Sequence, residues 1–334
     1  MTYTVGGTIE ATDYNGFANT SANNINKVWS TGTGDSGWGQ TAISTVSTGG
    51  TVTATQWATL VANLATAGQQ TNSTLTSRTQ PVTGNTIAIL ANVATDINTI
   101  TLNRGSAAAS GTTIGTFSGT TSKTTGTGSG QAAWTITFTH TVTFPSADQA
   151  RYFFNAGGLV KIMFGKSSTG TDHDPDWNTF AGQCGNIFLG GHVGDAAQTI
   201  AGQSYTGVTR LSGSGGTQTT LATNTGFYDL STTPLTLFQL NNITAPYEPE
   251  FIRVQASVNS NTTPTVLTLT TVWSDDGTGL AGATSNITGG TAVSSPATAI
   301  GAATAPTTLV NLIPPSTTYL SNTWGTPTIA ASVA

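Results

Sequence analysis

The chain has 334 residues, and only 7% of them are Asp, Glu, Lys or Arg, compared with about 25% in ordinary soluble domains. The formal net charge is −5, and Lys and Arg form no run, which argues against a surface for nucleic acid. A single cysteine excludes an internal disulfide and a zinc site built from cysteines. No segment approaches the ~18 apolar residues of a membrane-spanning helix, and residues 1–10 lack the features of a signal peptide, so we expect neither membrane insertion nor export.

The composition favours a folded, β-rich chain over a disordered one. Disordered chains are poor in aromatic and β-branched residues, whereas this chain has seven Trp, seven Tyr and twelve Phe, with abundant Thr, Val and Ile. Branched side chains suit the pleated, half-buried surface of a strand. A chain with so little charge is unusual as a separate soluble monomer, and we expect it to be part of a larger assembly.

The first amphipathic pattern predicts a helix near the N-terminus. Apolar residues from Tyr14 to Trp29 follow the three-and-four spacing of one helix face. Asp13 precedes them and is the expected N-cap.

A second helix has sharper boundaries. Thr53 and Gln56 match a capping box, and Val52 and Trp57 occupy the two positions of a hydrophobic staple. Gly68 is the expected end of this helix, because glycine is common just after the last helical turn.

A third amphipathic pattern predicts a helix from Asn85 to a stop at Gly105. We therefore divide the chain into a helical N-terminal docking domain, residues 1–106, and a β-rich domain, residues 107–334. The Gly-, Ser- and Thr-rich stretch near 119–130 is expected to be a linker or a loop.

The clearest strand pattern runs from Trp134 to Phe144. Apolar residues and His140 alternate with five Thr residues, so that one face carries only Thr. A long, uncharged strand recruits other chains unless something covers it. We hypothesise a homo-oligomer in which the Thr face packs within or between subunits.

Further elements are expected in the remainder. Ser146 and Gln149 form a second capping-box pair that predicts a short helix, and Asp176 is expected to cap another helix. Additional strands are predicted at 159–164, 226–230, 235–240, 251–258 and 266–273, with an edge strand within 317–333.

Titratable residues gather most densely in one short stretch. Asp172, Asp174 and Asp176 alternate as at the start of a calcium-binding loop, whose carboxylate oxygens suit a hard cation. The EF-hand pattern then requires Gly and Glu where this chain has Trp177 and Gln183, so the pattern is incomplete. The stretch is therefore either a candidate cation site or a polar turn with Asp176 as a helix N-cap.

Each of the other residues that could carry chemistry has a structural alternative. His140 and Cys184 suit buried positions, whereas Glu248 and Glu250 flank a proline and suit a solvated turn. The triplet Asp35–Gly37 resembles the segment around a serine-protease nucleophile, but its Gly-rich context favours a turn. We predict no catalytic residue and no cofactor.

Aromatic residues of the C-terminal half have two alternative roles. They stack on sugar rings if they line a surface, or they pack in the core, which is the commoner role. They are Trp177, Tyr205, Phe227, Tyr228, Tyr247, Trp273, Tyr319 and Trp324.

Three stretches together resemble a known family. They are GTGDSGWGQ at 32–40, VTATQWATL at 52–60 and DQARYFFNAGG at 148–158. The combination is similar to the tail-fibre-like virion structural proteins of tailed phages of marine bacteria and cyanobacteria, in which a helical N-terminal region precedes a β-rich region. The resemblance covers residues 10–190 and implies architecture, since the family has no catalytic residues to carry over.

The patterns predict an α+β fold, in which a small N-terminal helical bundle precedes a β-rich, antiparallel sandwich-like domain with one or two short helices. The resemblance implies a non-enzymatic virion structural protein located in the virion. A tail component is favoured: a tail fibre, an adaptor or a baseplate-associated protein. Its expected partners are other copies of itself, with a homotrimer favoured from the habits of phage fibres, and other virion proteins, but no nucleic acid. The alternatives are an adhesin that binds a host surface glycan or receptor, and a head decoration or capsid fibre protein.

Overall fold

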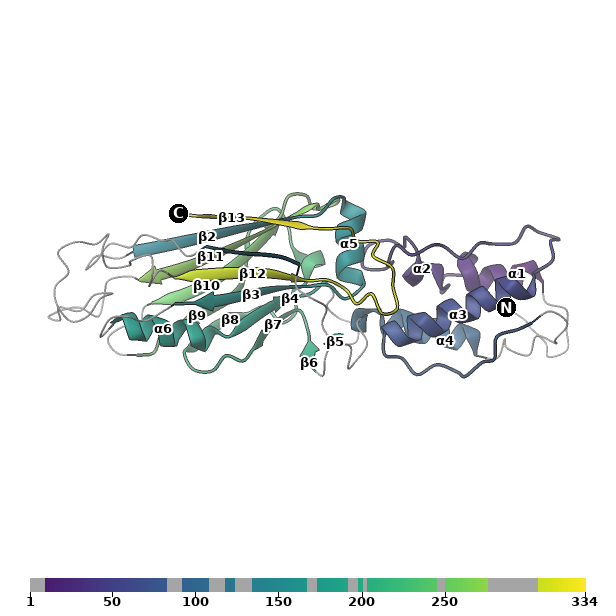
Figure 1. The fold of residues 1–334 in the computed structure, drawn as a ribbon, viewed down its shortest axis with the longest axis horizontal. Helices are drawn as coiled ribbons and strands as arrows, with labels where there is room; N and C mark the ends of the chain where they lie inside the picture. Colours follow the sequence, from purple (N-terminus) through teal and green to yellow (C-terminus); the bar gives the residue numbers. More distant parts are fainter. Residues whose placement is uncertain are drawn as a thin grey trace.

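The structure is a computed structural model that describes residues 10–82, 92–107, 118–123, 134–166, 173–191, 198–200, 203–244, 250–275 and 306–334. The N-terminal helices lie at one end of an elongated molecule, and an antiparallel β-sandwich lies at the other (Figure 1). The predicted α+β architecture is confirmed. Within the described ranges, no helix has both the length and the hydropathy that crossing a membrane requires.

Three short helical segments precede two longer helices in the N-terminal region. Their apolar side chains pack around Trp57, whose ring meets that of Tyr14 edge-on, with 5.3 Å between the centroids. The elements are α1 (Ala11–Asn15), a π-helical turn (Gly16–Thr20), α2 (Asn26–Trp29), α3 (Ala54–Gln70), α4 (Val93–Leu102) and a 3₁₀ turn (Arg104–Ser106).

The single long helix predicted at the N-terminus is wrong, because the chain turns between α1 and α2. The Asn24 side chain stabilises the turn by donating to the carbonyl of Ser21 and accepting from the backbone N–H of Lys27. Asn competes with helical backbone bonds in this way. Asp13 lies in the first turn of α1, and the N-cap is Glu10.

Helix α3 begins as predicted. Thr53 accepts from the backbone N–H of Gln56, and the Gln56 side chain accepts from the backbone N–H of Thr53, which completes the capping box. The end predicted at Gly68 is wrong, since the helix continues to Gln70. A Cβ at Gly68 would lie 2.5 Å from a methyl carbon of Leu75, so this glycine permits the next segment to approach the helix closely.

The third predicted helix corresponds to α4, which ends at Leu102, before the expected stop at Gly105. Its expected start at Asn85 lies outside the described residues. The linker predicted at 119–130 is wrong in part, because Ser118–Lys123 forms strand β1, and the rest of that stretch is not described.

Two antiparallel sheets form the sandwich. One has the strand order β1-β12-β3-β4-β7 and the other β13-β2-β11-β10-β9-β8, while β5 and β6 form a separate hairpin. Contacts of β1 with β13 and of β7 with β8 bring the sheets together along both sides. The strands are β1 (Ser118–Lys123), β2 (Trp134–Thr143), β3 (Leu159–Gly165), β4 (Asn186–Leu189), β5 (Gln198–Ile200), β6 (Gln203–Tyr205), β7 (Val208–Leu211), β8 (Thr217–Leu221), β9 (Leu235–Asn241), β10 (Phe251–Val258), β11 (Val266–Asp275), β12 (Thr307–Ile313) and β13 (Thr328–Val333).

The long strand β2 lies inside its sheet, where β13 and β11 cover its two edges. Ile136, Phe138 and Val142 are buried between the sheets, and the Thr residues alternate with them on the outward face. The resulting outer face is almost uncharged. Among the outward-facing residues of β2, β10, β11 and β13 whose side chains are described, the charged one is Arg253.

Four of the other predicted strands are confirmed as β3, β9, β10 and β11, and the predicted C-terminal edge strand is β13. The strand predicted at 226–230 is wrong, because Phe227–Asp229 forms a 3₁₀ turn in which the Asp229 side chain accepts from the backbone N–H of Gly226. Asp176 is not an N-cap, since it lies inside helix α6 (His173–Cys184).

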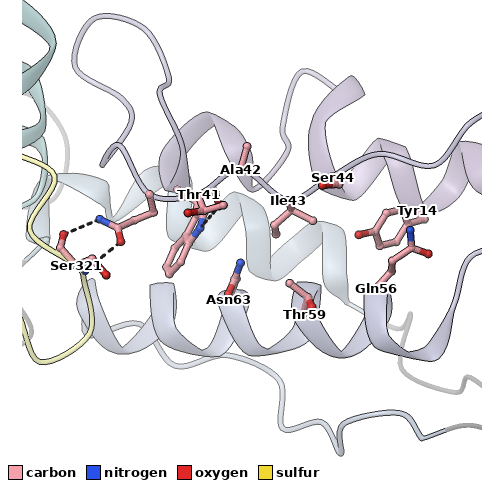
Figure 2. Close-up of a pocket in the computed structure, with 11 residues that line it drawn as sticks. Tyr14, Thr41, Ala42, Ile43, Ser44, Gln56, Thr59, Asn63 and Ser321 are labelled. Atoms are coloured by element: carbon pink, nitrogen blue, oxygen red, sulfur yellow. Dashed lines mark hydrogen bonds between the residues drawn. The ribbon is translucent and has the colours of Figure 1, made fainter.

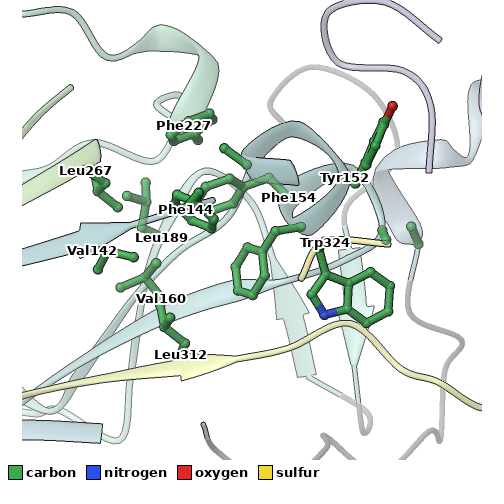
Figure 3. Close-up of a cluster of buried hydrophobic side chains, with 14 of the residues drawn as sticks. Val142, Phe144, Tyr152, Phe154, Val160, Leu189, Phe227, Leu267, Leu312 and Trp324 are labelled. Carbon is green, nitrogen blue, oxygen red and sulfur yellow. The ribbon is translucent and has the colours of Figure 1, made fainter. Parts of the chain in front are cut away.

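Helix α5 (Ala147–Asn155) lies between the sandwich and the N-terminal helices (Figure 1). Ser146 is its N-cap, as predicted, and accepts from the backbone N–H of Gln149. Its aromatic side chains enter the core shown in Figure 3, where Phe154 stacks on Phe227 with 4.2 Å between the ring centroids. This core is continuous with that of the helical region, so one apolar cluster extends through both parts.

Candidate functional site

The loop of residues 31–40 caps the end of α2. A helix leaves its last four carbonyl groups without partners inside the helix. Here the loop supplies partners for consecutive carbonyls at the end of α2 and thereby fixes its own position on the helix. The Ser36 hydroxyl donates to Lys27, and the backbone N–H groups of Trp38, Gln40 and Gly39 donate to Val28, Trp29 and Ser30.

Arg151 of α5 binds the outer side of this loop. Its guanidinium group donates to the carbonyl oxygens of Thr31 at 3.0 Å, Gly34 at 2.9 Å and Ser36 at 3.0 Å. The carbonyls converge because Gly34, at φ +57°, and its glycine neighbours adopt left-handed conformations. Hydrogen bonds from a cation are about twice as strong as neutral ones, so Arg151 is a principal link between loop and helix.

Asn155, one turn further along α5, connects the loop to the sandwich. Its Nδ2 donates to the carbonyl of Gly37 at 3.1 Å, and its backbone carbonyl accepts from the indole N–H of Trp38 at 2.9 Å. Its Oδ1 accepts from the Tyr228 hydroxyl at 2.6 Å. Burial raises the pKa of Tyr228 above its ordinary value, although the nearby Arg151 lowers it, so the hydroxyl keeps the proton that this bond requires.

Gly39 allows the loop to touch α5. It has a φ of +69°, and a Cβ built on it would lie 2.5 Å from the ring of Tyr152. Both the backbone conformation and the space therefore require glycine at this position.

Two glutamines attach further segments to the same place, which we call the junction. The Gln40 side chain accepts from the backbone N–H of Ser321 and donates to its carbonyl, both at 3.0 Å. At the end of α3, Gln70 donates to the carbonyl of Ala156 at 3.1 Å. The junction thus unites the loop, α3, α5 and the segment that leads to β13.

Side chains of the triplet Asp35–Gly37 make contacts that stabilise the junction. Asp35 pairs with Arg104, which follows α4, at 2.9 Å, and the Ser36 hydroxyl takes part in the cap of α2. The turn favoured by the Gly-rich context is confirmed.

A cleft of about 350 Å³ opens beside the junction, between α3 and residues 40–44 (Figure 2). This volume lies in the range of sites for small ligands. None of the described residues that line the cleft is charged. Thr59 and Asn63 of α3 face Thr41 and Ser44 across it, so hydroxyl and amide groups dominate its chemistry.

Two carboxylates meet at one amide in the sandwich. Asn242 Nδ2 donates to Asp176 of α6 and, at 3.0 Å, to Glu250, which precedes β10. The solvated turn expected at Glu250 is wrong, because that residue is 2% exposed and its carboxylate is held by the amide. Glu248 lies outside the described residues.

The predicted cation site stays a prediction. Asp172 and the side chain of Asp174 lie outside the described part of the structure, and the amide of Asn242 binds Asp176. Among the residues that are described, no three His, Cys, Asp or Glu side chains are arranged to hold a metal ion.

His140 and Cys184 occupy the buried positions predicted for them. Burial raises the pKa of the Cys184 thiol well above its ordinary value, although Arg210 lowers it, so the thiol is protonated and unreactive at neutral pH.

Most of the aromatic residues considered for glycan stacking pack in the core. Tyr247 lies outside the described residues, Tyr228 donates to Asn155, and Tyr319 is half-buried. The buried ones are Trp177, Tyr205, Phe227, Trp273 and Trp324.

Sequence reasoning does not single out Arg151 and Asn155 as the residues that hold the loop. The signal is their spacing, since residues four apart on α5 share one face. Asn242 gives no local signal for its contact with Asp176, which lies 66 residues earlier in the chain; Glu250 follows Asn242 by only 8 residues.

No protein-family model, no curated protein and no solved structure matches this chain. The roles of the motif residues therefore rest on their contacts within the molecule.

Proposed function

We propose that this chain is a non-enzymatic structural protein of a tailed-phage virion, and specifically a tail component that assembles as a homo-oligomer. The observation that carries the proposal is the junction. Its contacts come from Trp38, Arg151 and Asn155, which belong to two of the motifs that resemble the tail-fibre-like family. These motif residues therefore have an architectural use.

The shape and the continuous core support the same role. The helices and the sandwich are arranged end to end in an elongated molecule (Figure 1), and one apolar cluster runs through both. A part of this kind holds one end at a fixed position relative to the other. Docking through the helical end would place the sandwich away from the particle.

The outer face of the β13-β2-β11-β10 surface supports self-association. Thr139 lies opposite Thr270, and Thr141 lies opposite Thr268, in the pairing of β2 with β11. These Thr pairs form an outward-facing ladder with almost no charge around it. A second copy of the same face can approach such a surface without charge repulsion or the burial of unpaired charges.

Sedimentation velocity on the full chain tests the oligomer. We expect an oligomer for the natural chain and dissociation for the double variant Thr139→Lys/Thr270→Lys, because association would bury two added cations per face. The variant Asn19→Lys/Thr20→Lys adds the same charge at exposed positions of the helical region and should leave the oligomer intact. A monomer at high concentration would contradict self-association, and an oligomer that survives the Thr139/Thr270 change would exclude this face.

Mass spectrometry of purified particles tests the virion assignment separately. The chain should be present at a fixed copy number relative to the major tail proteins. Its absence from particles that contain their complete tails would contradict the proposal.

A further inference from the structure

Side chains of α1 and α2 bind the backbone of residues 41–46, and those of α2 bind residues 41–43 along one edge. The indole N–H of Trp29 donates to the carbonyl of Thr41 at 3.0 Å. The Asn26 amide donates to the carbonyl of Ile43 and accepts from its backbone N–H, both at 2.9 Å. Bonds at every second residue on one side are the pattern of an extended strand.

Asn26 thereby imitates a neighbouring strand, since it offers one donor and one acceptor to a single residue. Asn15 makes the same pair of bonds to Val46, both at 2.7 Å. The Asn26 amide thus occupies the place that a paired strand would take beside Ile43. Val46 follows Ile43 by three residues, so the strand-like alternation applies to residues 41–44 and does not extend to Val46.

The opposite edge of the segment is open. Backbone groups of successive residues in an extended chain point to opposite sides, so those of Ala42 and Ser44 point away from Asn26. Both residues are exposed, and within the described ranges neither has a hydrogen-bond partner. Two residues of a strand span about 6.6 Å, so this edge presents free donors and acceptors at the spacing of a β-ladder.

The cleft of about 350 Å³ lies between this segment and α3. Figure 2 shows Thr59 and Asn63 pointing from α3 toward the segment. The Asn63 amide makes no hydrogen bond to any described residue and is available to a ligand. Because the described part of the lining carries no charge, an ionic ligand would lose hydration there without gaining a counter-charge, which favours a neutral ligand.

We propose that this cleft binds an extended, uncharged polypeptide segment of a neighbouring molecule. Its backbone pairs with Ala42 and Ser44, as in β-strand addition, and its other edge meets Thr59 and Asn63. The two-residue repeat of free backbone groups selects a peptide over a saccharide, whose hydroxyls do not alternate at that spacing. The inference goes beyond the proposed function, and it holds or fails regardless of where the chain sits in a particle.

Fluorescence anisotropy tests it, using the full chain and a labelled, end-blocked pentapeptide of alternating Thr and Val. Thr59→Trp fills the cleft and should weaken binding at least about tenfold. Thr55→Trp places the same side chain one turn earlier on α3, outside the cleft, and should change the affinity less than about twofold. Thermal melting of both variants shows that each is folded.

Methylation of alternate amide nitrogens in the peptide tests the backbone pairing. It removes the donors that a ladder needs, so the methylated peptide should bind at least about tenfold more weakly. Equal binding of the two peptides, equal loss in both Trp variants, or no saturable binding at millimolar peptide would each overturn the proposal. Binding of a neutral trisaccharide that Thr59→Trp abolishes, without binding of the peptide, would make the cleft a saccharide site instead.

Discussion

At the scale of single residues, amide side chains connect distant segments of this molecule, a role that ion pairs often have in other proteins. Asn26, Gln40 and Asn155 each donate and accept at once, and each connects segments that are distant in sequence or in structure. An amide carries two donors and an acceptor and has no charge to desolvate. This explains how a chain with 7% charged residues fixes its loops and its junction.

Glycine is the second residue type with a defined role, because it allows left-handed backbone and close contacts in the loop of residues 31–40. Substitution of Gly39 tests this role. Gly39→Ala combines a left-handed backbone with a contact to Tyr152 and should lower the free energy of unfolding by about 2–4 kcal/mol. Gly34→Ala is the matched control, since it has a similar φ with open space around its Cβ, and should cost only about 1–2 kcal/mol. Urea unfolding measures both, and equal losses would show that the ring contact is unimportant.

The buried thiol of Cys184 gives a pH dependence. Its folded pKa is raised by burial, so its contribution to stability is complete below the unfolded pKa of about 8.5 and is lost as the pH rises above it. The free energy of unfolding should therefore fall above this pH, with a contribution of up to about 1.4 kcal/mol per pH unit from this group. Urea unfolding between about pH 7 and about pH 10 should show a shallower fall for Cys184→Ala. Identical slopes would contradict a buried, protonated thiol.

At the scale of elements, local signals and distant contacts determine different parts of the structure. The caps at Thr53 and Ser146 and the alternation in β2 are short-range patterns, and the sequence predicts all three correctly. Gly68 predicts a helix end that does not occur, because its contact with Leu75 arises only after the chain folds back.

The same distinction applies to the site. The motif at 32–40 predicts a turn, and the structure contains one. Its binding to Arg151 and Asn155 could not be predicted, since a residue more than a hundred positions away supplies each bond. The contact of Asp176 with Asn242 is likewise hidden from sequence, because 66 residues separate the two.

The cap of α3 provides a test at this scale. Thr53→Ala removes the side chain that accepts from the backbone N–H of Gln56, and should lower the free energy of unfolding by about 1 kcal/mol. Thr55→Ala, an exposed change within the same helix turn, should cause no loss, because Ala has the higher helix propensity. Thermal or urea unfolding compares the two, and an equal effect would show that the cap does not stabilise the helix.

At the scale of the whole molecule, the junction makes the helices and the sandwich a single unit. The apolar cluster runs through both parts, and the loop, α3, α5 and the segment before β13 meet at one place. An extended two-part molecule with a weak connection would unfold in two steps. A shared core makes unfolding cooperative.

The variant Arg151→Ala tests whether the junction joins the helices and the sandwich into one cooperative unit. Arg151→Ala removes three hydrogen bonds to the loop and the ion pair with Asp148. The Arg151 side chain is only 17% exposed, so the change should lower the free energy of unfolding by about 3 kcal/mol. The natural chain should unfold in one calorimetric transition, and the variant should unfold earlier. Lys27→Ala removes an exposed cation and should have little effect. Two well-separated transitions in the natural chain would contradict a shared core.

The central claim, that this chain is a structural part of a phage tail, is tested most directly by cryo-electron microscopy of purified particles with focused reconstruction of the tail. We predict density at the tail into which the joined helices and sandwich fit as one body, with several symmetry-related copies in contact. Density on the capsid would contradict the tail assignment while keeping the structural class, and the absence of such density from the whole particle would contradict the claim itself.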